Sequence, residues 1–118
     1  MLEFLRKIRR TLAISIGLFI IYMSLRSQLH LTQYVSDKTM HFVAYGTWAA
    51  VACATPRGRE RITLYAAIIF ATGLAIEIIQ PNVGRDKSML DLAANSAGIA
   101  VGILAALWAR RWLYREVR

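Results

Sequence analysis

The sequence predicts an all-α integral membrane protein, a bundle of four helices with both chain ends on the cytoplasmic side. Hydrophobic residues make up 57% of the 118-residue chain, and its mean hydropathy is +0.42, whereas a soluble domain is about 45–50% apolar. Long apolar runs alternate with short polar segments, and the strict alternation typical of half-buried strands is absent. The length fits one domain, which we place at residues 1–118.

The first two helices are predicted over about residues 8–28 and 37–55. The first contains the uncharged run Thr11–Leu25 after a basic start. Such a start is also typical of a signal peptide, but no small-x-small cleavage pattern follows, which favours an uncleaved membrane helix. Pro56 ends the second helix. A spanning helix needs about 20 residues, with a range of about 17–25, so both short apolar runs borrow flanking residues to cross.

The third and fourth helices are predicted over about residues 61–80 and 88–110. The apolar run of the third carries a single charge, Glu77, and the segment Pro81–Gly84 reads as a helix stop and turn. Arg110 and its neighbour Arg111 are expected to end the fourth helix. The chain therefore has four predicted spans.

The basic residues predict the orientation. The two ends and the second loop hold most of them, whereas the first and third loops hold few. By the positive-inside rule, both termini and the middle loop are cytoplasmic. The net charge of +8 does not indicate a nucleic-acid partner, because the basic residues lie in short clusters between apolar runs. The single cysteine, Cys53, lies in an apolar run, where we interpret it as a packing residue.

In this orientation the remaining polar residues gather in the outward half of three helices. Helical spacing places them on one side of each helix. Because unpaired polar groups in hydrocarbon cost several kcal/mol, these sides should face one another. The expected set is Asp37, His41 and Tyr45 on the second helix, Glu77 and Gln80 on the third, and Asp91, Asn95, Gly98 and Gly102 on the fourth, with Lys38 and Arg85 nearby.

Each of these residues also has a structural interpretation. Asp91 follows Ser88 with the spacing of a capping box, and Asp37 can cap the second helix. Gly98 and Gly102 fit a close-packing motif that can join helices or two copies of the chain. Glu77 fits a structural role least well, because the end of a helix dipole and an apolar setting both disfavour its charge.

Three motifs resemble the VanZ-like family of small membrane proteins. They are Asp37-Lys-x-x-His41-Phe42-x-x-Tyr45, then Glu77-x-x-Gln80, then Gly84-Arg85-x5-Asp91-Leu92-x-x-Asn95-x-x-Gly98-x-x-x-Gly102. The resemblance covers about Asp37 to Gly102 and leaves the first helix and the basic tail unmatched. It implies a four-helix protein of the bacterial cytoplasmic membrane. Founding members are associated with resistance to the glycopeptide antibiotic teicoplanin, and this association does not fix a biochemical activity.

Two functions of different classes fit these residues. One is an enzyme acting on an anionic lipid or cell-envelope precursor at the outer leaflet, with Glu77, Asp91 and His41 as acid–base groups. Residues expected to bind the substrate are Lys38, Arg85, Gln80, Asn95, Asp37 and Tyr45. The other is a non-catalytic protein that binds a lipid or partner and shields the envelope.

Further alternatives concern the cofactor, transport and assembly. A divalent metal held by Asp37, His41, Glu77 and Asp91 is compatible with the ligand types, although the spacing alone does not select it. A proton-coupled carrier is a third alternative, but the internal repeat expected of many carriers is not evident. Self-association through Gly98 and Gly102 is also an open alternative.

Overall fold

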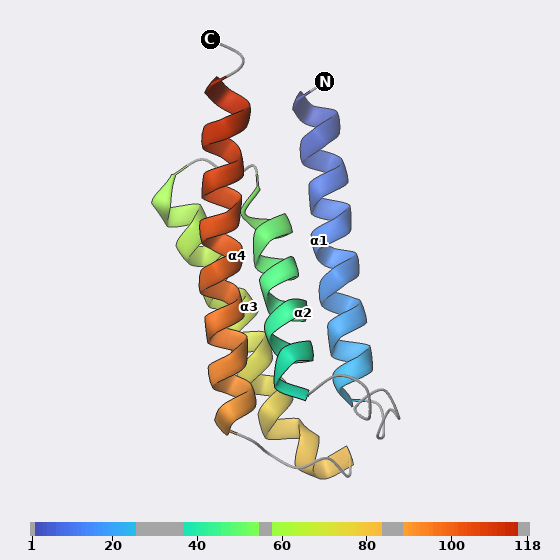
Figure 1. The fold of residues 1–118 in the computed structure, drawn as a ribbon. Helices are drawn as coiled ribbons and strands as arrows, with labels where there is room; N and C mark the ends of the chain where they lie inside the picture. The colour runs from blue at the N-terminus through green and yellow to red at the C-terminus, as the bar shows by residue number, and fades with distance from the viewer. Residues whose placement is uncertain (1, 26–36, 55–57, 84–88, 116–118) are drawn as a thin grey trace.

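A computed structural model of the chain describes residues 2–25, 37–54, 58–83 and 89–115 (Figure 1). The described residues form four α-helices and one short 3-10 helix, with no strand among them, which confirms the all-α prediction. In chain order they are α1 (Leu2–Leu25), α2 (Asp37–Ala52), α3 (Arg59–Ile79), η2 (Gln80–Val83) and α4 (Met89–Arg115).

Three of the helices are long and apolar enough to cross a membrane: α1 over Glu3–Leu25, α3 over Arg59–Ile79 and α4 over Met89–Trp112. The exception is α2, which has 16 residues. At about 1.5 Å of rise per residue it is about 24 Å long, less than the hydrocarbon core of about 30 Å. Three of the four predicted spans thus correspond to helices that are long enough to cross a membrane, whereas α2 is shorter than a span.

The ends of the helices differ from their predicted positions for two reasons. Arginine and lysine are good helix formers, so the basic segments do not stop α1 or α4: α1 begins at Leu2, and α4 continues through Arg110 to Arg115. By contrast, α2 ends at Ala52, three residues before its predicted end at residue 55. The chain tightens there, with the Ala54 N–H donating to the Val51 carbonyl at 3.3 Å.

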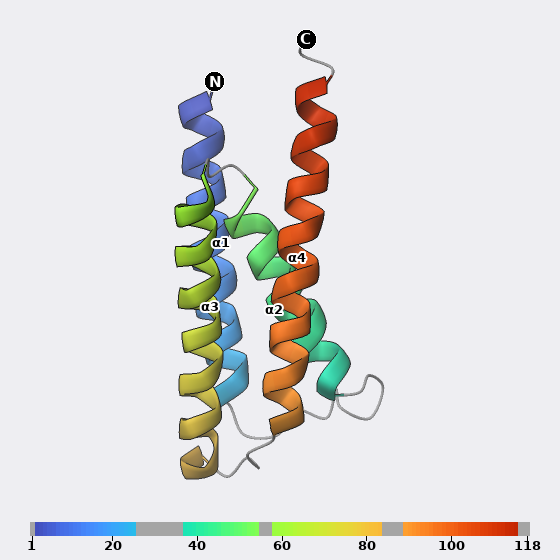
Figure 2. The same cartoon turned by 90° about the vertical axis from the view of Figure 1, so that its left-hand side faces the viewer.

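The chain ends lie together at one end of the molecule (Figures 1 and 2). The first residues of α2 and α4 lie at the opposite end, and α2 runs between α1 and α4. The molecule measures 52 × 26 × 21 Å along its principal axes. Its long axis follows the helices, so polar residues near the start of α2 and of α4 come to the same depth.

Glycines set the spacing between α2 and α4. A Cβ atom at Gly98 would clash with the carbonyl oxygen of Phe42, and one at Gly102 with the carbonyl oxygen of Gly46. A Cβ at Gly46 would in turn lie 3.2 Å from the Gly98 carbonyl oxygen. The two backbones therefore touch, as expected of small residues at a membrane helix interface.

The hydrophobic core is small, and the outside of the molecule is apolar. Tyr45, Ala49, Ile69 and Ile76 are among the buried core residues. Large hydrophobic side chains cover the exposed faces of the helices, which in a water-soluble protein would be a very large apolar surface. Examples with more than half of their surface exposed are Leu18, Phe19, Tyr22, Leu64, Ile78, Leu104, Trp108 and Trp112. An apolar exterior is the property of a protein that lies in a membrane.

Candidate functional site

The centre of the candidate site joins α2 to α4 through three buried side chains. His41 on α2 faces Asn95 on α4, with 2.8 Å between the histidine Nδ1 and the asparagine Oδ1. The other ring nitrogen, Nε2, lies 3.7 Å from Oδ2 of Asp91, one helical turn before Asn95. His41, Asp91 and Asn95 are 8%, 4% and 1% exposed. The sequence-predicted facing of these three residues is confirmed.

The contact with Asn95 indicates which ring nitrogen of His41 donates. An amide oxygen only accepts, so Nδ1 donates its proton to Asn95. In a neutral imidazole the other nitrogen, Nε2, then has a lone pair, and it faces the Asp91 carboxyl group. The His41–Asp91 pair therefore places a buried imidazole nitrogen and a buried carboxyl oxygen 3.7 Å apart between two helices.

Tyr45 extends this polar centre one turn deeper along α2. Its ring stacks on that of His41, with centroids 6.3 Å apart and an interplanar angle of 8°. A Cβ at Gly73 of α3 would lie 3.1 Å from the Tyr45 ring and 3.0 Å from the Asn95 amide nitrogen, so this glycine lets α3 approach both. The Tyr45 hydroxyl is buried and has no hydrogen-bond partner among the described residues.

Glu77 reaches the same region from α3. It is 2% exposed and lies one turn after Gly73 on the buried side of its helix. Gly73, one turn before it, packs against Tyr45 and Asn95, so α3 brings Glu77 in beside α2 and α4. The sequence-predicted meeting of α2, α3 and α4 around polar side chains is thus present. We call His41, Tyr45, Glu77, Asp91 and Asn95 the polar cluster.

Gln80 has a different neighbour from the one predicted. It is 2% exposed, but its amide nitrogen donates to the backbone carbonyl of Ser24 on α1 at 3.2 Å. Its position is a consequence of η2, which continues the chain of α3 past Ile79 toward the end of α1. Gln80 thus ties α3 to α1, a contact that its spacing from Glu77 did not indicate.

Lys38 lies at the edge of the polar cluster. Its amino group is 3.5 Å from Oδ1 of Asp91, and half of its side chain is exposed. It is therefore the cation of the described residues best placed to meet a ligand there. The side chain of Asp37, the whole of Arg85 and the capping residue Ser88 lie outside the described residues.

The predicted metal site is only partly covered. Among the described residues, no group of three His, Cys, Asp or Glu side chains lies close enough together to hold a metal ion. His41 and Asp91 form a pair, and the predicted ligand Asp37 has its side chain outside the described part. The described geometry supports a polar binding cluster and gives no metal ligand set.

Two structural features lacked a clear sequence signal. Gly46 packs against Gly98 and Gly102. Its position on α2 is compatible with this role but does not single it out. Arg9 is buried, at 9% exposed, but in the sequence it is one of four neighbouring basic residues and nothing sets it apart.

Comparisons with protein-family models, with curated proteins and with solved structures found no match to this chain.

Proposed function

We propose that the chain is a VanZ-like four-helix bundle of the bacterial cytoplasmic membrane that binds an anionic head group at its polar cluster. The head group belongs to a lipid or a lipid-linked envelope precursor of the outer leaflet. The residues that carry the family resemblance support this proposal, since His41, Tyr45, Glu77, Asp91 and Asn95 all lie buried in the cluster.

The single observation that carries the proposal is this burial. Five polar side chains from three helices meet inside a molecule whose outer faces are apolar. Ionisable residues within membrane segments are costly and mark functional sites by default. A purely structural interface between α2 and α4 would need only the glycine contacts that the two helices already make.

The orientation is supported by where the basic residues lie. The described residues near the two termini and the start of α3 form one end of the molecule (Figure 1), and they are rich in arginine and lysine. That end faces the cytoplasm under the positive-inside rule. The polar cluster then faces outward, with Lys38 at its edge as the cation for a phosphate.

Binding fits the geometry of His41 better than its use as a free general base does. Both of its ring nitrogens face a partner, Asn95 on one side and Asp91 on the other. A base needs a nitrogen within hydrogen-bond reach of the proton that it removes. The alternative, an enzyme, is favoured by the buried Asp91 carboxyl group, which lies between His41 and the cation Lys38.

The binding test uses undecaprenyl phosphate added to the purified protein in detergent, with bound lipid measured by native mass spectrometry. We expect Lys38→Gln to weaken binding about tenfold, because a hydrogen bond to a charged group contributes about 1.5–3 kcal/mol. Lys7→Gln is the matched control, since Lys7 is exposed at the other end. Equal binding by wild type and Lys38→Gln contradicts the proposed head-group site.

The same samples separate binding from catalysis. Extracted lipid is analysed by mass spectrometry after incubation with wild type and with Asp91→Asn. A new lipid product from wild type that Asp91→Asn does not form supports the enzyme. Unchanged lipid in both, with retained binding, supports the binder. A raised inhibitory concentration of teicoplanin in cells that express wild type, lost with Lys38→Gln, would connect the site to resistance.

A further inference from the structure

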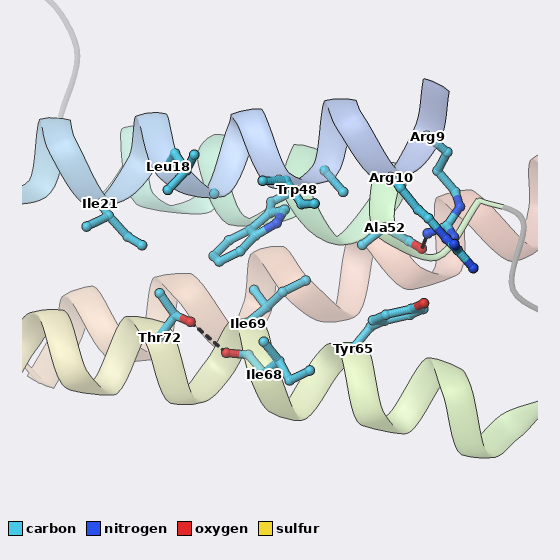
Figure 3. A pocket seen from close by; sticks show the side chains of 13 residues that line it. Arg9, Arg10, Leu18, Ile21, Trp48, Ala52, Tyr65, Ile68, Ile69 and Thr72 are labelled. Atoms are coloured by element: carbon cyan, nitrogen blue, oxygen red, sulfur yellow. Dashed lines mark hydrogen bonds between the residues drawn. The ribbon is translucent and has the colours of Figure 1, made fainter. Parts of the chain in front are cut away.

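A second site is a pocket of about 440 Å³ between α1 and α3, which runs along α1 from Arg9 to Ile21 (Figure 3). Trp48 and Ala52 of α2 form its floor. Its walls are mostly apolar, with Leu18 on α1 and Ile68 on α3. Thr72 in the α3 wall donates its hydroxyl to the Ile68 carbonyl at 2.8 Å, so its donor is used within its own helix.

The wall has arginines at one end only. Arg9 and Arg10 line the end of the pocket that is nearest to the chain termini (Figures 1 and 3). The groove therefore has a cationic end and an apolar length. This pattern matches a molecule with an anionic head and a hydrocarbon chain.

Arg9 is held in place by neutral groups. One of its terminal nitrogens donates to the Ala52 carbonyl at 2.8 Å, at the end of α2. Its guanidinium carbon lies 5.6 Å from the centre of the Tyr65 ring. It is 9% exposed, its Nε is buried without a hydrogen-bond partner, and it forms no ion pair with any described carboxylate. Burying a charge of this kind is costly unless it is paired, so an anion bound beside Arg9 would be stabilised.

The end of α2 lies at the Arg9 end of the pocket, where Ala52 is the last residue of the helix. The Ala52 carbonyl belongs to the last turn of α2, where backbone acceptors have no partner within the helix. Arg9 satisfies this acceptor and at the same time lies at the mouth of the groove.

We propose that this groove binds one phospholipid with an anionic head group, its phosphate at Arg9 and Arg10 and one acyl chain along Leu18 and Trp48. The lipid belongs to the leaflet at the end of the molecule that holds both chain termini. A phospholipid fits better than a peptide, because the walls offer an apolar surface without a row of free hydrogen-bonding groups. The inference does not depend on the function proposed for the polar cluster.

The test uses delipidated protein in detergent with dioleoylphosphatidylglycerol or dioleoylphosphatidylcholine, and native mass spectrometry to measure the bound lipid. We expect one phosphatidylglycerol per chain, bound about tenfold more tightly than phosphatidylcholine. Both lipids carry a phosphate, but the choline ammonium makes phosphatidylcholine net neutral and is repelled by Arg9 and Arg10. Arg9→Gln should remove this preference. Arg111→Gln should keep it, because Arg111 is exposed at the same end and does not line the groove.

A second pair of variants tests the acyl chain without touching Arg9. Leu18→Trp puts a larger side chain into the groove, whereas Phe19→Trp enlarges an exposed neighbour that does not line it. We expect Leu18→Trp to weaken phosphatidylglycerol binding about tenfold and Phe19→Trp to leave it unchanged. This pair keeps the test valid if Arg9→Gln loosens the end of α2 and unfolds the protein.

Four results would overturn the inference. Equal affinity of wild type for the two lipids would show that the groove does not select an anionic head group. Wild-type affinity in a folded Arg9→Gln variant would show that Arg9 does not bind the phosphate. Wild-type affinity in Leu18→Trp would show that no acyl chain lies in the groove, and loss of binding in Lys38→Gln would show that the lipid binds at the polar cluster.

Discussion

Asn95 and Ser96 are neighbours on α4 with opposite surroundings. The Asn95 side chain is buried and accepts from His41 across the helix interface at 2.8 Å. The exposed Ser96 hydroxyl donates to the Leu92 carbonyl of its own helix at 3.0 Å. Only the first bond joins two helices, so the two residues offer a matched test of what the polar cluster contributes to stability.

We expect Asn95→Ala to lower the free energy of unfolding by about 1–2 kcal/mol, since it leaves the buried His41 Nδ1 without its acceptor. Ser96→Ala should change it by less than about 0.5 kcal/mol. Both are measured by unfolding in mixed detergent micelles, followed by circular dichroism. Equal losses in the two variants would mean that the His41–Asn95 bond adds nothing to the packing of α2 on α4.

At the residue scale the sequence predicted the polar cluster better than its surroundings. His41, Asp91 and Asn95 could be paired because helical spacing fixes which residues share a face, and buried polar groups must find partners. Gln80 could not be placed, because its partner is a backbone carbonyl on α1, and backbone groups carry no sequence signal. Arg9 was missed for the same reason, since it donates to the Ala52 carbonyl.

At the scale of elements, the contact between α2 and α4 depends on glycines, which have no Cβ atom. Gly98 and Gly102 of α4 face α2, and a Cβ at either would clash with a backbone oxygen. A Cβ at Gly17 of α1 would instead lie 2.7 Å from the ring of Trp48, a side chain that can shift. An added Cβ is therefore harder to accommodate at Gly98 or Gly102, against backbone, than at Gly17, against a side chain.

We therefore expect a graded loss of stability from three substitutions. Gly102→Ala should cost about 2–3 kcal/mol, because the helices must separate, and Gly17→Ala about 1 kcal/mol. Ala105→Val on the exposed face of α4 should cost less than about 0.5 kcal/mol. The same unfolding measurement ranks them, and a Gly102→Ala variant as stable as wild type would show that the helices do not meet this closely.

This use of the glycines bears on self-association. Gly98 and Gly102 are buried against α2 of the same chain, so two copies of the protein would have to meet on another surface. The sequence motif identifies a close-packing face but not the helix that covers it. A helix within the chain and a second copy satisfy the same pattern.

The helices themselves were largely predictable, and their ends were not. Long apolar runs identify spanning helices because the hydrocarbon core imposes a minimum length. Arg110 and Arg111 were expected to end α4, yet arginine continues a helix well, and α4 runs on to Arg115. The short α2 also differs from its prediction, and the carbonyl of its last residue, Ala52, is the acceptor for Arg9.

At the scale of the whole molecule, the structure shows which helix ends lie together, and the sequence predicts which side of the membrane they face. The helices place the starts of α2 and α4 at one end and the chain termini at the other (Figure 2). Charge asymmetry predicts which end faces the cytoplasm, because the positive-inside rule acts during insertion and not through packing. Packing alone would be the same for either orientation.

Cysteine labelling tests the arrangement of the helix ends and their orientation in the membrane together. The native Cys53 is fully buried, so it should give little background with a membrane-impermeant maleimide. Met89 is 70% exposed at the start of α4, while Glu60 and Arg111 are exposed toward the opposite end. We expect Met89→Cys to label in whole cells, and Glu60→Cys and Arg111→Cys to label only in inverted membrane vesicles. The unsubstituted protein is the control for Cys53.

The pattern of labelling separates two kinds of error. If all three sites label in inverted vesicles and Met89→Cys does not label in cells, the two ends of the molecule do not lie on opposite sides of the membrane. If the pattern is complete but reversed, the fold is right and both termini face outward. The polar cluster would then face the cytoplasm, and the head group that it binds would come from the inner leaflet. The proposed link to glycopeptides, which act outside the cell, would fail while the binding chemistry stayed intact.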